Sequence, residues 1–183
     1  MSSRLLVMIA LVAVLGSLPR RSPAADAELT VTVEDERVVI RAGDQPVATY
    51  VFRDPQILRP YFTHVHAPGG VQVTRTHPPR KDVDATDHDT MHPGIWLAFG
   101  DLGGADFWRN KGRVEHLEFA QRPEVHAGVV RFAARNRYLA GEKEICRELA
   151  RCSLRRVGPG YLLTLRPDSA AEFFTQMTQI EAG

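Results

Sequence analysis

Short runs rich in β-branched and aromatic residues, separated by turn residues, fill the chain after residue 27 and limit its possible folds most strongly. Glu34-Asp35-Glu36 separates the first two runs as in a hairpin, and Gly158-Pro159-Gly160 marks a turn between the last two. We predict strands at Leu29–Val33, Arg37–Arg41, Val47–Phe52, Tyr61–His66, Val71–Thr76, Ile95–Phe99, Val114–Gln121, Gly128–Tyr138, Lys143–Arg155 and Tyr161–Arg166. Because only Ala170–Ile180 shows a helical pattern, we predict an all-β fold, an antiparallel β-sandwich.

Residues 1–27 have the pattern of a secretory signal peptide. Arg4 supplies the positive charge, and Leu5–Leu18 is an apolar run that is short for a membrane span. Small residues then allow cleavage after Ala25 or Ala27. An uncleaved anchor is the alternative, because Pro19-Arg20-Arg21 interrupts the usual region before the cleavage site. We therefore expect a secreted or periplasmic protein with a single β-sandwich domain at residues 28–183.

The charge of the chain argues against two classes of partner. The formal net charge is +1, and the signal segment contributes three arginines and one aspartate, so that the processed chain would carry −1. A near-neutral domain has no basic footprint for nucleic acid and no field that attracts an anionic membrane. We expect a small-molecule or oligosaccharide ligand, no nucleic acid and no membrane partner after signal removal; the oligomeric state stays open.

The two cysteines, Cys146 and Cys152, lie in what looks like one extended segment. Six residues of strand span roughly 20 Å, whereas bridged Cα atoms lie within about 7 Å of each other. We predict that both are reduced, and a bridge between two chains is the alternative.

Asp87–Lys111 combines histidines, carboxylates and both tryptophans of the chain without one hydrophobic period. It reads as a buried apolar strand, Ile95–Phe99, with polar, turn-rich loops on both sides. Loops carried on a rigid strand are a common place for binding and catalytic residues. The sequence therefore predicts where the site lies, but not which reaction it performs.

His88 and His92 are the candidate acid or base groups, and Asp87, Asp101 and Asp106 are their candidate carboxylate partners. The spacing of the histidines also suits a metal site with Asp87 or Asp89 as a third ligand. The neighbouring aspartates and Pro93 disfavour the helix that such a site uses, so we assign no metal ligand and expect no cofactor, and a metal at His88 and His92 stays open. The plainer alternative is a loop whose histidines only bond to nearby carbonyls and carboxylates.

Other residues are candidates for substrate binding. Trp96 is more typical of a core, whereas Trp108, with polar neighbours, suits the face of a sugar ring. The candidate substrate-binding residues are Arg59, Tyr61, Arg75, Trp108 and Arg109. We expect Arg59, His88, His92, Asp101, Asp106 and Trp108 to converge on one concave surface. His116 and His126 are expected to be structural or surface residues.

Strand alternation predicts two faces near Tyr61. Phe62, His64 and His66 would share one face, and Tyr61, Thr63 and Val65 the other.

An ordered series of motifs resembles a known family. The series consists of Arg59-Pro60-Tyr61, Gly69-Gly70, Thr74-Arg75, Asp87-His88, His92-Pro93-Gly94-Ile95-Trp96, Gly100-Asp101 and Asp106-Phe107-Trp108. It resembles the PmoA-like family of exported bacterial proteins, also called domain of unknown function 6807, over about Val47–Tyr161. Relatives carry a richer histidine run at the position of Asp89-Thr90-Met91, which weakens a metal hypothesis. Family members are longer, so we expect this domain to be truncated at its C-terminus.

The resemblance implies a β-sandwich of the galactose-mutarotase-like supersandwich type, which handles carbohydrates. The methane oxygenase label of the family does not carry over, because a membrane subunit needs several spanning helices. We expect an exported carbohydrate-related protein, a sugar-active enzyme with a histidine and carboxylate acid-base pair. The alternatives are a non-catalytic glycan-binding module and, third, a metal-dependent oxidoreductase; whether the protein is an enzyme stays open.

Overall fold

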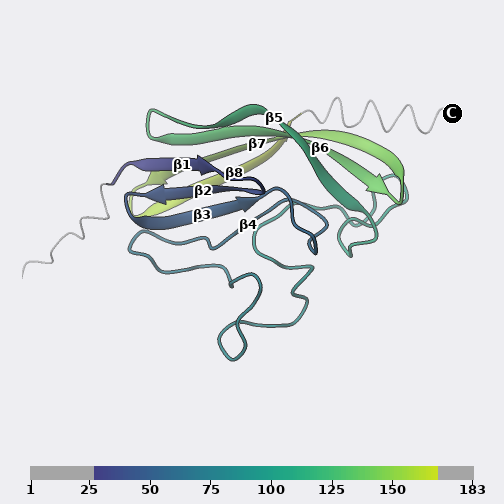
Figure 1. Cartoon of the computed structure of the whole chain (residues 1–183), viewed down its shortest axis with the longest axis horizontal. Coiled ribbons are helices and arrows are strands. Elements are labelled where there is room, and N and C mark those ends of the chain that lie inside the picture. The colour runs from purple at the N-terminus through teal and green to yellow at the C-terminus, as the bar shows by residue number, and fades with distance from the viewer. Residues whose placement is uncertain (1–26, 169–183) are drawn as a thin grey trace, which may run out of the picture.

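The computed structural model describes residues 27–168 as two four-stranded antiparallel sheets (Figure 1). The first sheet contains β1 (Leu29–Val33), β2 (Arg37–Ala42), β3 (Gln45–Val51) and β4 (Tyr61–Thr63) in that order, and the second contains β5 (Arg113–His126), β6 (Val129–Ala140), β7 (Lys143–Val157) and β8 (Gly160–Asp168). The part of the chain that the structure describes contains no helix, and so none that could cross a membrane. The all-β, antiparallel prediction is confirmed. The predicted signal peptide and the helical pattern at Ala170–Ile180 lie outside the described residues.

Alternating side chains bury one face of each sheet. On β2, Val38 and Ile40 are buried while Arg37 and Arg41 are exposed, as the strand period requires. The inner faces of both sheets meet in one core, which contains Val38, Ile40, Val47, Tyr50, Phe52, Phe62, Val130, Phe132, Cys152 and Leu154. This shared core makes the two sheets a sandwich.

A second, smaller core fixes part of the long segment between β4 and β5. This segment extends away from the two sheets in Figure 1. Near its end, Leu102 and Phe107 pack against Tyr138 and Ile145 of the second sheet. The rings of Phe107 and Tyr138 are 5.0 Å apart in an edge-to-face contact. The loop around Trp108 is therefore anchored on a sheet.

Eight of the predicted strands are present, Leu29–Val33 with the predicted bounds and the others with shifted ends, and two are wrong. Val71–Thr76 makes one isolated bridge through Gln72, and Val71 and Val73 are 66% and 62% exposed. Ile95–Phe99 makes one bridge through Ile95, and it is not a buried strand, because Ile95 and Leu97 are 37% and 39% exposed. Both runs lack a neighbouring strand long enough to pair with, since β4 has only three residues.

The chain leaves β4 earlier than the sequence suggests. His64 has a φ of 48°, which ends the strand and turns its side chain away from the face of Phe62. Phe62 is in the core, whereas His64 lines the same outer surface as Tyr61 and Thr63. The predicted face shared by Phe62, His64 and His66 is therefore wrong.

The inner face of the second sheet also buries polar groups. Asn136 donates a hydrogen bond to Glu148 across 3.0 Å, and both side chains are buried. Burial raises the pKa of Glu148, although bonds from Asn136 and Tyr138 oppose this shift. Cys146 and Cys152 lie on one strand without a bridge between them, as predicted, and both are buried.

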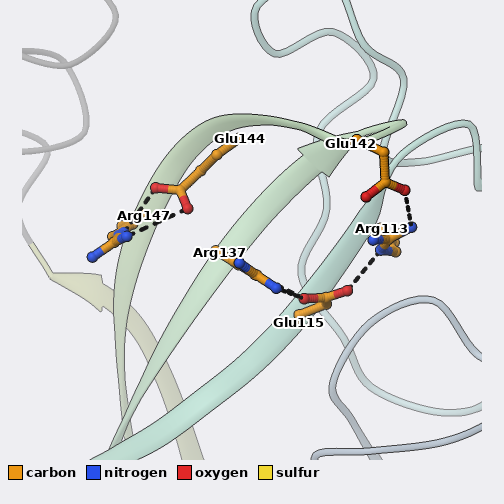
Figure 2. A network of polar contacts seen from close by, with 6 residues as sticks. All are labelled: Arg113, Glu115, Arg137, Glu142, Glu144 and Arg147. Carbon is orange, nitrogen blue, oxygen red and sulfur yellow. Dashed lines mark hydrogen bonds and ion pairs between the residues drawn. The ribbon is translucent and has the colours of Figure 1, made fainter.

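The outer face of β5–β7 carries a network of charged side chains (Figure 2). Glu115 bonds to Arg113 and Arg137 at 2.7 Å and 2.6 Å, and Arg147 bonds to Glu144 at 2.8 Å. Exposed pairs of this kind contribute about 0–1 kcal/mol each. Because these charges compensate each other, we regard this face as a solvated surface and not as the functional site.

Candidate functional site

The loop that carries His88 and His92 is tied to the first sheet at Ile95. Ile95 and Phe62 exchange two backbone hydrogen bonds, at 2.7 Å and 2.8 Å. Gly94 allows this approach, because a Cβ atom there would lie 1.9 Å from the carbonyl oxygen of Phe62. The sequence thus places a glycine where no side chain fits.

Arg75 holds the same loop from the other side. Its guanidinium donates to the carbonyl oxygens of Ala85, Asp87, His88 and His92, at distances from 2.7 to 3.0 Å. A planar cation with several donors suits this convergence of carbonyl groups. Arg75, predicted to bind substrate, is therefore placed to shape the loop.

Four rings from this loop and the next form what we call the aromatic cluster: His88, His92, Trp96 and Trp108. The rings of Trp96 and Trp108 are 4.8 Å apart, and that of His92 lies 5.7 Å from Trp96 and 6.3 Å from Trp108. His88 lies against His92 at 5.9 Å. Trp108 is 45% exposed, and both histidines are exposed. The cluster thus presents aromatic surface to solvent.

Arg59 is a buried residue that holds this cluster in place. It is only 4% exposed, its guanidinium lies 4.2 Å from the centre of the Trp96 ring, and it donates to the carbonyl oxygen of Trp108 at 3.3 and 3.4 Å. Stacking on a cation and a bond to the neighbouring backbone restrict both tryptophans. The structure therefore brings Arg59, His88, His92 and Trp108 together, as the sequence suggested, and it adds Trp96, which we had assigned to the core.

Two of the predicted carboxylate partners stabilise turns. Asp101 accepts a bond from the backbone of Gly104 at 3.0 Å. Asp106 accepts bonds from the backbone and the guanidinium of Arg109, at 2.9 and 3.0 Å, and these bonds lower the pKa of Asp106. Both carboxylates, and Arg109 with them, therefore form hydrogen bonds within their own loop.

Asp87 is the carboxylate that meets a histidine of the cluster. Its Oδ2 lies 3.1 Å from Nδ1 of His88, and this contact lowers the pKa of Asp87. Both side chains are more than half exposed. A carboxylate on Nδ1 orients the ring and leaves Nε2 free for a ligand or a proton transfer.

Tyr61 belongs to a different place, which we call the Tyr61 cavity. This cavity has a volume of about 640 Å³, and its lining includes Thr49, Asp54, Tyr61, Thr63, His64 and His77. Tyr61 donates to Asp54 at 2.8 Å, and the ring of His77 lies 5.5 Å away. Sequence reasoning missed this cavity; the only signal was the number of histidines near Tyr61.

Metal ligands are not gathered in either place. Within residues 27–168, no three side chains of His, Cys, Asp and Glu are close enough together to hold one ion. The geometry of these residues therefore does not support the hypothesis that His88, His92 and an aspartate bind one metal ion.

A region that holds the aromatic cluster and most of the Tyr61 cavity matches a known family. The profile of the family described as "Family of unknown function (DUF6807)" matches residues 37–171. The chain belongs to the DUF6807 family. The matched region includes the aromatic cluster and the lining of the Tyr61 cavity except residues 34–36, whereas β1 precedes it. No curated protein and no solved structure matched this DUF6807 chain.

Proposed function

We propose that this protein is an exported, PmoA-like member of its family that binds a carbohydrate through the aromatic cluster. The observation that carries the proposal is the pair of tryptophan rings 4.8 Å apart, one of them 45% exposed, with His92 beside both. The signal-like pattern of residues 1–27 supports export to the periplasm or the medium.

Carbohydrate is the ligand class that fits this surface best. A sugar has apolar C–H faces that stack on aromatic rings and hydroxyl groups that need polar partners. The cluster offers both kinds of contact, because His92 lies beside the tryptophans and His88 lies against His92. Arg59 holds the platform in place, so that little ordering is needed when a ligand binds.

One contact favours a second candidate, catalysis on the bound sugar. The Asp87 carboxylate orients His88, and an oriented imidazole can act as a general acid or base. Turnover would then release a chemically changed sugar. If the bound oligosaccharide is released unchanged at every pH, binding is the only function of this site.

Replacing Trp108 by alanine should weaken oligosaccharide binding about tenfold or more, because exposed aromatic anchors dominate such surfaces. The backbone oxygen of Trp108 that accepts the bond from Arg59 remains, so the loop should keep its shape. Isothermal titration calorimetry with a panel of neutral and acidic oligosaccharides measures this change in affinity.

Leu162→Ala is the matched control, because Leu162 is also 45% exposed but lies on β8. This control should bind as the wild type does. Equal affinities of the wild type and Trp108→Ala for every ligand that binds would contradict the proposal, and so would a panel in which nothing binds.

A further inference from the structure

The Tyr61 cavity lies on the outer face of the first sheet. The register places Thr63 opposite Thr49, and Thr49 opposite Val39, on neighbouring strands. Side chains of this row and of the next one, which contains Tyr61 and Val51, line the cavity. The inward-facing Phe62 between them is in the core. The floor of the cavity is therefore built on a rigid sheet, and the loops at Asp54–Gln56 and His77-Pro78 form its walls.

The partly buried lining of this cavity is polar and carries one charged group, Asp54, whereas its other charged residues, Glu34, Asp35, Glu36, Arg37 and Arg53, are exposed. The carboxylate of Asp54 accepts three bonds, from the backbone of Gln56 at 2.8 Å, from Tyr61 at 2.8 Å and from the backbone of Ile57 at 3.0 Å. Burial opposes the ionised form of Asp54, but these bonds together lower its pKa. The charge of Asp54 is thus compensated by hydrogen bonds from residues of the cavity lining and its adjacent loop.

The histidines and the tyrosine of the lining are neutral at pH 7. Burial lowers the pKa of His64 and of His77, and the nearby charges of Asp54 and Asp89 only partly offset this shift at His77. Burial, together with the bond to Asp54, raises the pKa of Tyr61. The more exposed lining residues Glu34 and Arg37 form a salt bridge at 2.6 Å.

Two polar atoms of the lining lack a partner. Thr63 is 3% exposed, and its hydroxyl makes no hydrogen bond within the described part of the chain. Nδ1 of His77 is also buried and unbonded among these residues. Buried polar atoms are nearly always paired, so each unpaired one needs an explanation. A bound molecule with hydroxyl groups would satisfy both atoms.

We propose that the Tyr61 cavity binds a neutral, polyhydroxylated small molecule of about monosaccharide size, with Thr63 and His77 contacting its hydroxyl groups. The volume lies within the range of about 300–1,000 Å³ that ligand pockets show. Val39, Val51 and Pro78 offer apolar surface for the C–H face of such a ligand. This site goes beyond the glycan-binding surface, and it needs no residue of the aromatic cluster.

The experiment is a titration of the full chain with free monosaccharides and the corresponding alditols, in which the amide NMR resonances are recorded at each step. Glucosamine and glucuronic acid serve as charged analogues of glucose. A neutral sugar should shift the resonances of residues 61–64 and 77 in the wild type. Thr63→Val keeps the shape but removes the hydroxyl, and it should weaken binding about tenfold. Thr164→Val on β8 is the matched control and should bind normally.

Trp108→Ala separates this site from the proposed glycan surface. It should leave the affinity for the monosaccharide unchanged, even if it abolishes oligosaccharide binding. The proposal is overturned if no neutral sugar or alditol shifts residues 61–64 and 77, or if the charged analogues bind more tightly than their neutral parent. An unchanged affinity in a folded Thr63→Val variant, or a lost affinity in Trp108→Ala, would also overturn it.

Discussion

Replacing Gly94 by alanine should destabilise the protein by about 1–3 kcal/mol and remove carbohydrate binding, because overpacking at a closely packed position forces the backbone apart. The new Cβ would lie 1.9 Å from the carbonyl oxygen of Phe62. Relieving this clash requires breaking the two hydrogen bonds between Phe62 and Ile95, which attach the loop of His88, His92 and Trp96 to β4. Urea unfolding measures the first effect and titration with the oligosaccharide that binds best measures the second.

Gly100→Ala is the control for this prediction. No atom lies within 4 Å of a Cβ placed at Gly100. Alanine there should be neutral or stabilise slightly, since it reduces the freedom of the unfolded chain. Equal stabilities of Gly94→Ala and Gly100→Ala would show that the loop does not depend on the close approach to β4.

Stability should fall as the pH is lowered from about 6.5 to about 4, and His116 should cause a measurable part of that loss. Burial, and then the charge of Arg53, lower the pKa of His116 to about 4. Between this value and the ordinary pKa of histidine, the unfolded chain binds a proton that the folded chain does not bind. Unfolding therefore becomes easier as the pH falls, by at most about 1.4 kcal/mol per pH unit from this one group.

His116→Phe tests the assignment, because it keeps an aromatic ring against Phe52 and Phe119, which lie 4.7 and 4.6 Å from the histidine ring. Urea unfolding at several pH values should show a shallower loss of stability in this variant than in the wild type. His126→Gln, at an exposed position, should keep the wild-type slope. Parallel slopes for the wild type and His116→Phe would assign the acid sensitivity to other groups.

The candidate site could be located from the sequence only in part. A polar stretch with no hydrophobic period pointed to Asp87–Lys111, and the aromatic cluster lies there. The roles of Asp101, Asp106 and Arg75 could not be read in the same way. An aspartate or an arginine looks the same in the sequence whether its side chain binds a ligand or closes a turn. Only its hydrogen-bond partners in the structure distinguish the two roles.

Trp96 shows a similar limit. Its place in an apolar run favoured a core position, because hydrophobic runs are usually buried. The run lacks a strand to pair with beyond Ile95, so it stays at the surface and Trp96 faces Trp108.

By itself, the sequence determined eight strands of this protein and the turns that join two pairs of them. The alternation of Val38 and Ile40 with arginines, and the turns at Glu34–Glu36 and Gly158–Gly160, already specify which runs pair and which face is buried. These signals are local, because a hairpin joins neighbours in the chain. Only the tertiary structure decided what meets at the two sites. Arg59 reaches Trp108, which is 49 residues away, and His77 comes to lie beside Tyr61. Such contacts depend on how loops fold back over a sheet, and no periodic pattern in the chain encodes that path.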